Sequence, residues 1–218
     1  TGAALIEHVD AIAFTGSVAT GRLVAESCAR NFIPAFLELG GKDPVIIMPD
    51  ADIDEAARIV LRASVQATGQ ACQSLERVYV PADRHDAFVD TLVALAERVE
   101  LNYPDIHRGQ LGPLIFAKQA DIIAAHVDDA RQRGASVRCG GVIETHGGGT
   151  WIRPTVLTGV DHSMRVMTEE TFGPVIPVMP YVDIDEAVEL ANDTNYGLSA
   201  AVIGPDVEAA AAVARRIN

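Results

Sequence analysis

The sequence predicts an α/β fold in which a largely parallel sheet is flanked by helices. Short apolar runs rich in Ile and Val alternate with longer segments whose apolar residues recur every three or four positions. Gly and Pro residues stand between these segments, where strands and helices would have to end. Because strand, helix and strand in succession form the unit of a parallel sheet, this alternation favours an α/β arrangement.

The first part of the chain, up to residue 70, contains the first alternating units. Strands are expected over residues 11–14, 34–39 and 44–48, and helices over residues 18 to about 31 and 53 to about 69. Ser17 is placed to cap the first helix and Asp52 the second, where Glu55 completes a capping box by reaching back to the backbone. A glycine pair at 40–41 ends the second strand.

The remainder of the chain continues the pattern. Strands are expected over residues 77–80, 137–139, 155–157, 175–179 and 199–203. Helices are expected from the cap Asp83 through Val99, from Phe116 until Gly134, from Asp183 to before Asn195, and over 207–217. Residues 102–113 are expected to form a loop. Two glycine clusters, 140–141 and 147–149, are expected to bracket a mobile surface hairpin or loop.

Composition narrows the classes of partner. The chain has 218 residues, of which 49% are hydrophobic, so a substantial core is available. Its formal net charge of −13 disfavours nucleic acid and anionic membranes, because both select basic surfaces. No apolar run is as long as a membrane span, and no signal peptide is visible.

The cysteines and histidines exclude two kinds of site. Cys28, Cys72 and Cys139 form no C-x-x-C pair and are odd in number, which argues against a disulfide framework and favours a reducing cytoplasm. The six histidines show no H-x-x-x-H spacing, so no metal site is expected.

Two reactive side chains stand in glycine-containing segments. Glu38 lies in Leu-Glu-Leu-Gly-Gly-Lys, residues 37–42, and Cys72 lies in Gly-Gln-Ala-Cys, residues 69–72. Glycine beside a functional group lets a ligand approach the backbone closely. Taken singly, such a Cys is usually a small buried hydrophobe and such a Glu a charge at a strand end. Taken together, they indicate a base and a nucleophile.

The two segments, in this order and a few tens of residues apart, resemble the E-L-G-G-K and G-Q-x-C motifs of the aldehyde dehydrogenase family. Three further segments are similar to family motifs: Phe-Thr-Gly-Ser at 14–17, Glu-Glu-Thr-Phe-Gly-Pro at 169–174, and residues 192–200, which match N-x-T-x-Y-G-L-[SA]-A. By themselves, the first of these would be a plain N-cap serine and the second an acidic turn before a strand. The resemblance covers essentially all 218 residues.

The resemblance implies an aldehyde dehydrogenase-like fold and a division of the chain. Residues 1–41 correspond to the C-terminal part of a dinucleotide-binding domain, and residues 42–218 to a catalytic domain truncated at its C-terminal end. The family's glycine-rich C-terminal motif, its oligomerisation strand and its oxyanion-binding Asn have no counterpart here. The chain alone is therefore expected to be an incomplete dehydrogenase, and the complete protein a homo-oligomer.

The resemblance also implies a reaction: oxidation of an aldehyde to a carboxylic acid with NAD or NADP. Cys72 would form a thiohemiacetal and then a thioester, and Glu38 would activate the water that releases the acid. The cofactor would be bound by residues from both parts of the chain, namely Thr15, Gly16, Ser17, Leu39, Glu170 and Phe172. The general look of residues 72–77 suggests a semialdehyde substrate such as succinate semialdehyde.

Two other functions stay open from the residues alone. A thiol hydrolase or esterase would pair Cys72 with a histidine, although no histidine here has a recognisable local motif and E-L-G-G-K would be unexplained. A catalytically incomplete fragment would keep the fold and serve only in association. Turnover that depends on a nicotinamide cofactor separates the aldehyde dehydrogenase from both of these alternatives.

Overall fold

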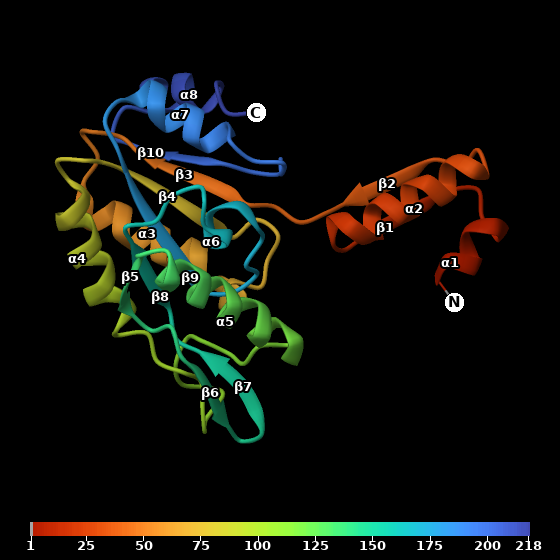
Figure 1. Ribbon diagram of the computed structural model, residues 1–218, viewed down its shortest axis with the longest axis horizontal. Coiled ribbons are helices and arrows are strands. Elements are labelled where there is room, and N and C mark those ends of the chain that lie inside the picture. The colour runs from red at the N-terminus through yellow and green to blue at the C-terminus, as the bar shows by residue number, and fades with distance from the viewer. Residues whose placement is uncertain (1) are drawn as a thin grey trace. The chain divides into compact units, whose positions relative to one another are not determined.

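The computed structural model describes residues 2–218, which form two compact units, one ending at Gly41 and the other spanning Lys42–Asn218 (Figure 1). The smaller unit consists of α1 (Gly2–Leu5), η1 (Ile6–His8), β1 (Ile12–Thr15), α2 (Val18–Arg30) and β2 (Ala35–Glu38). The last three elements form one βαβ unit, because β1 and β2 pair in parallel. The short turns α1 and η1 precede the first expected strand and were not predicted.

The larger unit is built on a six-stranded sheet with the order β10-β3-β4-β9-β8-β5. Its strands are β3 (Asp43–Ile47), β4 (Leu75–Pro81), β5 (Ser136–Cys139), β8 (Thr155–Thr158), β9 (Val175–Tyr181) and β10 (Ala201–Ile203). Neighbours pair in parallel from β10 to β8, and β5 pairs antiparallel with β8 at one edge. The predicted α/β class with a largely parallel sheet is therefore confirmed.

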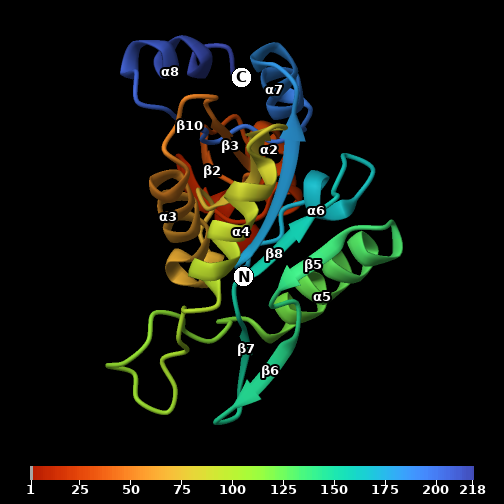
Figure 2. The same ribbon diagram turned by 90° about the vertical axis from the view of Figure 1, so that its left-hand side faces the viewer.

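Helices cover both faces of this sheet (Figure 2). The helices of the larger unit are α3 (Ile53–Val65), η2 (Gln66–Gly69), α4 (His85–Ala96), α5 (Ala117–Gln132), α6 (Arg165–Thr168), α7 (Ile184–Asn192) and α8 (Val207–Ala214). Successive residues of β4 face opposite ways: Val78 and Val80 join the core beneath α3 and α4, whereas Tyr79 joins the core beneath α5 and α7. Burying each such aliphatic side chain contributes about 1.5–3 kcal/mol, so two apolar layers hold the central strands.

Several helix starts follow the predicted chemistry, and one does not. The Asp52 side chain accepts a hydrogen bond from the Glu55 amide at 2.8 Å, and Asp183 caps α7 in the same way. Asp83 was expected to cap the next helix, but α4 begins at His85 and its N-cap, Arg84, makes no side-chain capping bond. The expectation was wrong because Asp83 falls one residue too early for the N-cap position.

The loops differ from expectation at three places. The two glycines Gly147 and Gly148 form the tip of a hairpin between β6 (Ile143–His146) and β7 (Gly149–Ile152), rather than one of its ends. β4 runs through Pro81 instead of stopping before it, and the last predicted strand begins at Ala201 instead of residue 199. Within residues 2–218, no helix combines the length and apolar character needed to cross a membrane.

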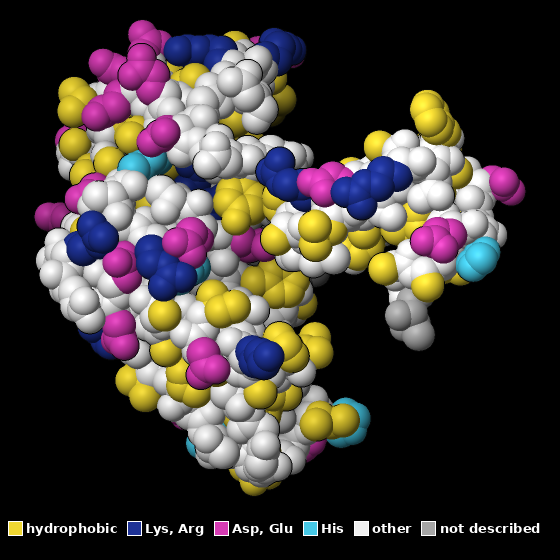
Figure 3. Space-filling view, turned by 45° about the vertical axis from the view of Figure 1, so that its right-hand side comes forward, with side chains coloured by type: hydrophobic (Ala, Val, Ile, Leu, Met, Phe, Trp, Pro, Cys, Tyr) yellow, Lys and Arg dark blue, Asp and Glu magenta, His cyan; other side chains and the backbone are white. Residues whose placement is uncertain are grey.

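The surface carries both charge signs, and acidic and basic side chains alternate over the face shown in Figure 3. In the smaller unit, the large hydrophobic side chains Leu23, Phe32 and Phe36 are exposed. Both strands of the two-stranded β1–β2 sheet are edge strands.

Candidate active site

The Phe-Thr-Gly-Ser and Glu-Leu-Gly-Gly segments meet at the carboxyl ends of two parallel strands. Thr15 ends β1 and lies opposite Glu38, which ends β2. The Gly16 amide donates a hydrogen bond to the Glu38 carbonyl oxygen at 3.0 Å. The carboxyl edge of a parallel sheet is the usual position for a ligand site in α/β proteins, so the sequence-predicted residues of the smaller unit form one group.

The start of α2 has the features of an anion site. Ser17 is the N-cap residue, and its hydroxyl oxygen accepts a hydrogen bond from the Thr20 amide at 3.2 Å. The remaining free amides of the first turn carry partial positive charge. Gly21 lies against Leu39, since a Cβ added to Gly21 would stand 2.4 Å from Leu39 Cδ2. These residues fit the phosphate side of a dinucleotide.

The loop before Cys72 adopts a strained conformation. Ala67, Thr68 and Gly69 have φ angles of 53°, 62° and 67°, a region that favours glycine. The expected helix over 53–69 therefore ends earlier, at Val65. Strain of this kind persists only where surrounding contacts hold it.

Those contacts come from two other segments. Gly69 packs on the backbone of residues 173–174, because a Cβ there would lie 2.3 Å from the Gly173 carbonyl carbon. The Gln70 side-chain oxygen accepts from the Ile115 amide at 2.8 Å, and the Thr68 hydroxyl donates to the Gly112 carbonyl at 3.1 Å. Cys72 is thus carried half-buried on a loop that is fixed on both sides.

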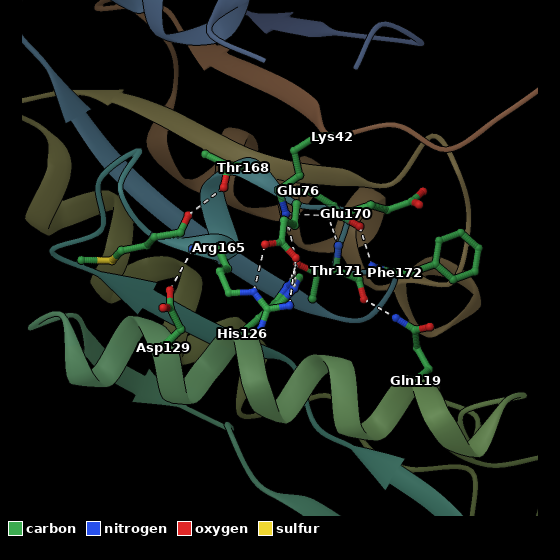
Figure 4. A network of polar contacts seen from close by, with 12 residues as sticks. Lys42, Glu76, Gln119, His126, Asp129, Arg165, Thr168, Glu170, Thr171 and Phe172 are labelled. Atoms are coloured by element: carbon green, nitrogen blue, oxygen red, sulfur yellow. Dashed lines mark hydrogen bonds and ion pairs between the residues drawn. The ribbon is translucent and has the colours of Figure 1, made fainter. Parts of the chain in front are cut away.

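The segment 169–174 precedes β9 and is held by Glu76 (Figure 4). The two carboxylate oxygens of Glu76 accept hydrogen bonds from the amides of Thr171 and Phe172, each at 2.8 Å. Phe172 has a φ of 51°. In Figure 4 the side chains of Glu170 and Phe172 extend to the same side of this network, away from Asp129.

A buried ion pair lies at the centre of the network. Lys42 and Glu76 have side chains that are 1% and 3% exposed, and Lys42 Nζ lies 2.6 Å from Glu76 Oε2. Lys42 Nζ also donates to the Thr171 hydroxyl oxygen at 3.0 Å. Burial lowers the pKa of Lys42, and Glu76 opposes that shift.

His126 extends the network toward α5. Its Nδ1 lies 3.2 Å from the Thr171 hydroxyl oxygen, and its Nε2 lies 3.4 Å from Glu169 Oε2 without the geometry of a hydrogen bond. Burial lowers the pKa of His126, with Lys42 and Arg165 acting in the same direction and Glu169 opposing them. A neutral imidazole that accepts the Thr171 proton agrees with this environment.

The segment 192–200 has a structural role here. The Ser199 hydroxyl donates a hydrogen bond to the Asp43 carboxylate at the start of β3. Arg77, fully buried, donates to the carbonyls of Lys42, Leu190 and Ala191 at 2.7–3.1 Å. These bonds fix the end of α7 and the following segment to the amino ends of β3 and β4.

The structure therefore gathers the predicted residues into two groups, one in each unit. Thr15, Gly16, Ser17, Glu38 and Leu39 lie together in the smaller unit, and Cys72, Glu170 and Phe172 belong to neighbouring loops of the larger unit. The larger-unit loops lie at the amino ends of β4 and β9.

Sequence analysis missed the polar residues beneath these loops: Lys42, Glu76, Thr171 and His126. One sequence signal was available, because Glu76 and Arg77 are two charges directly before the apolar run Val78–Val80. Charges inside a buried strand need partners. Four histidines are engaged elsewhere: His85 with Asp86, His126 with Glu169, His146 with Glu144, and His162 with Asp193. A Cys–His hydrolase gains no support from these contacts.

Comparison with known proteins assigns the chain to a protein family. The Aldehyde dehydrogenase family model matches residues 1–218. A "Putative succinate-semialdehyde dehydrogenase [NADP(+)]" from Mycolicibacterium smegmatis is 42% identical over 201 residues, which are 92% of this chain and 39% of that protein. The chain belongs to the aldehyde dehydrogenase family.

Solved structures agree with this assignment. The putative aldehyde dehydrogenase PutA from Anabaena variabilis is 55% identical, with a TM-score of 0.98 over 100% of this chain and 46% of that one. A Mycobacterium tuberculosis aldehyde dehydrogenase complexed with NAD+ is 34% identical, with a TM-score of 0.94 over 99% of this chain and 45% of that one. The chain therefore spans less than half the length of these relatives.

Proposed function

We propose that the protein containing this chain oxidises an aldehyde to a carboxylic acid with NAD or NADP. We assign residues 1–41 to the dinucleotide-binding domain and residues 42–218 to the catalytic domain. The observation that carries the proposal is the packing of the Cys72 loop on the acidic segment, in which Gly69 lies against the backbone of Gly173. That contact joins the proposed nucleophile to the proposed cofactor segment, which neither alternative function requires.

Each proposed catalytic residue has one task. The Cys72 sulfur bonds to the aldehyde carbon and gives a thiohemiacetal, and loss of hydride from that carbon leaves a thioester. Glu38 takes a proton from water, whose oxygen attacks the thioester and releases the carboxylic acid and the Cys72 thiolate. Sulfur suits both halves, since a thiolate is a strong nucleophile and a good leaving group.

The cofactor residues divide between the two groups. Thr15, Gly16, Ser17 and Leu39 would contact the diphosphate side through the α2 start, whose free amides fit an anion. Glu170 would accept hydrogen bonds from two hydroxyls of the nicotinamide ribose, and Phe172 would pack near the ring. When bound, the nicotinamide supplies the hydride acceptor. The M. smegmatis relative is named for NADP+ and the M. tuberculosis structure holds NAD+, so both cofactors remain in the proposal.

The proposed substrate is a semialdehyde such as succinate semialdehyde, supported by the name of the M. smegmatis relative. We also propose a homo-oligomer in the cytoplasm.

The test uses the native full-length protein that contains this chain, with Cys72→Ala and Glu38→Gln. Cys72→Ala is expected to abolish formation of reduced cofactor while cofactor binding persists. Glu38→Gln is expected to keep a burst of about one reduced cofactor per site without steady turnover, because only thioester hydrolysis is blocked. Cys139→Ala, which removes a thiol on β5, serves as the matched control. Equal loss of the burst in the first two variants would contradict the division of roles.

A further inference from the structure

We propose that Lys42 and Glu76 are positioning residues that set the orientation of the segment 170–172 toward the nicotinamide half of the cofactor. The inference rests on the proposed function, since it takes Glu170 and Phe172 as cofactor contacts. The buried pair serves cofactor binding and hydride transfer, and it leaves the intrinsic reactivity of Cys72 almost unchanged.

The carboxylate of Glu76 is the acceptor for three donors. These are Lys42 Nζ at 2.6 Å, the Thr171 amide at 2.8 Å and the Phe172 amide at 2.8 Å. Successive amides that converge on one anion define a concave backbone turn. Phe172 at a φ of 51° is an unfavourable conformation for a large side chain, and it needs such a fixed acceptor to persist.

Thr171 is held on its other sides as well. Its hydroxyl contacts Lys42 Nζ at 3.0 Å and His126 Nδ1 at 3.2 Å, and its carbonyl oxygen accepts from Gln119 Nε2 at 2.6 Å. Thr171 itself is fully buried, whereas its neighbours Glu170 and Phe172 are only half-buried. We infer that the fixed central residue determines where the two flanking side chains point; Figure 4 shows both extending to the same side of the network.

Glu76 and Lys42 also connect this segment to the rest of the proposed site. Glu76 lies on β4, four positions after Cys72, so the strand that follows the nucleophile carries the acceptor. Lys42 is the last residue of the Glu38 segment, and its carbonyl accepts from Arg77 Nε at 2.7 Å. Glu76 therefore joins the strand that follows Cys72 to the segment that carries Glu170 and Phe172.

A contribution to folding stability is a weak explanation for the presence of the buried Lys42–Glu76 pair. Desolvating two charges offsets most of their attraction, and apolar replacements of similar volume are often neutral or stabilising. An apolar pair would leave the Thr171 and Phe172 amides without an acceptor, however. Here the carboxylate fixes the turn by accepting both amides. A role in positioning the turn therefore differs from a role in packing, which an apolar pair could also fulfil.

The experiment compares two charge-free pairs in the native full-length protein: Lys42→Met with Glu76→Gln, and Lys42→Met with Glu76→Leu. Gln retains one carbonyl oxygen for the two amides, whereas Leu retains none. We expect the cofactor KM to rise and the hydride-transfer rate to fall by about tenfold in the Leu pair, and by less in the Gln pair, because each lost bond to a charged acceptor corresponds to roughly a tenfold change. Cys72 alkylation by iodoacetamide without cofactor should stay within about twofold of wild type.

One control variant and two decisive outcomes test the positioning role. Ser64→Ala removes a buried bond to the Leu75 carbonyl beside Glu76, and it should lower the unfolding temperature without changing the cofactor KM. If the Leu pair loses thiol reactivity and cofactor affinity in parallel, or keeps the wild-type KM, the positioning role is overturned. If Glu170→Gln and Phe172→Ala themselves leave cofactor binding unchanged, the proposed cofactor assignment fails, and the positioning role fails with it.

Discussion

Gly69→Ala is expected to separate the Cys72 loop from the segment it packs on. The added Cβ would stand 2.3 Å from the Gly173 carbonyl carbon and 2.7 Å from the Pro174 nitrogen, both of them backbone atoms. Real Cβ atoms essentially never approach closer than 3.0 Å, so the loop has to move by about 0.7 Å or more. Side-chain rotation cannot relieve the contact, because the atoms belong to the main chain.

The expected loss in the free energy of unfolding is the sum of two contributions. A Cβ at a φ of +67° costs about 1–2 kcal/mol relative to glycine, and forcing an extra methyl into a packed contact costs about 1–3 kcal/mol. The free energy of unfolding of the larger unit should therefore fall by about 2–5 kcal/mol. In the native full-length protein, a shift of this size at Cys72, the proposed nucleophile, should also lower the rate of the proposed aldehyde oxidation by about tenfold to a hundredfold.

The matched control is Gly148→Ala. Gly148 has a φ of +79° and a Cβ there meets nothing within 4 Å, so it carries the conformational cost without the contact. Urea unfolding followed by the fluorescence of Trp151, the single tryptophan, reports the larger unit in both variants. The difference between the two variants measures the packing of Gly69 on residues 173–174. Equal destabilisation by the two substitutions would refute the role of this contact.

Three further predictions use other parts of the structure. Iodoacetamide should label Cys72 before Cys139 and Cys28, because Cys28 is 1% exposed and burial raises the pKa of Cys139. Peptide mapping of the folded protein would contradict this order if Cys28 or Cys139 were labelled faster than Cys72. Burial lowers the pKa of His126 in the folded protein, so the unfolded chain binds the proton first and wild-type stability decreases as the pH is lowered below about 6.5. His126→Gln should reduce this loss of stability, which the urea midpoints along a pH series would measure. Arg77→Met should lower the free energy of unfolding by about 3 kcal/mol or more, because several buried carbonyls lose their donor; a change under about 1 kcal/mol in urea unfolding would be inconsistent with that account.

The sequence by itself determined the fold class and the positions of the motifs. Alternating apolar periods predicted the parallel sheet, and short motifs located Glu38, Cys72 and the segment 169–174 before any contact was known. These features are local: a cap, a strand period or a glycine turn depends on residues within a few positions of one another. For the same reason, the Asp52 and Asp183 caps were found from the sequence.

Only the tertiary structure decided how the motifs are supported. The Lys42–Glu76 pair, its two amide donors in the segment 169–174, and the contact of Gly69 with Gly173 join residues that are about 30 to 130 positions apart. No periodicity records such a contact, because it depends on which strands become neighbours in the sheet. The left-handed conformations of Ala67 and Phe172 are likewise set by these long-range contacts and run against the local preferences of their side chains.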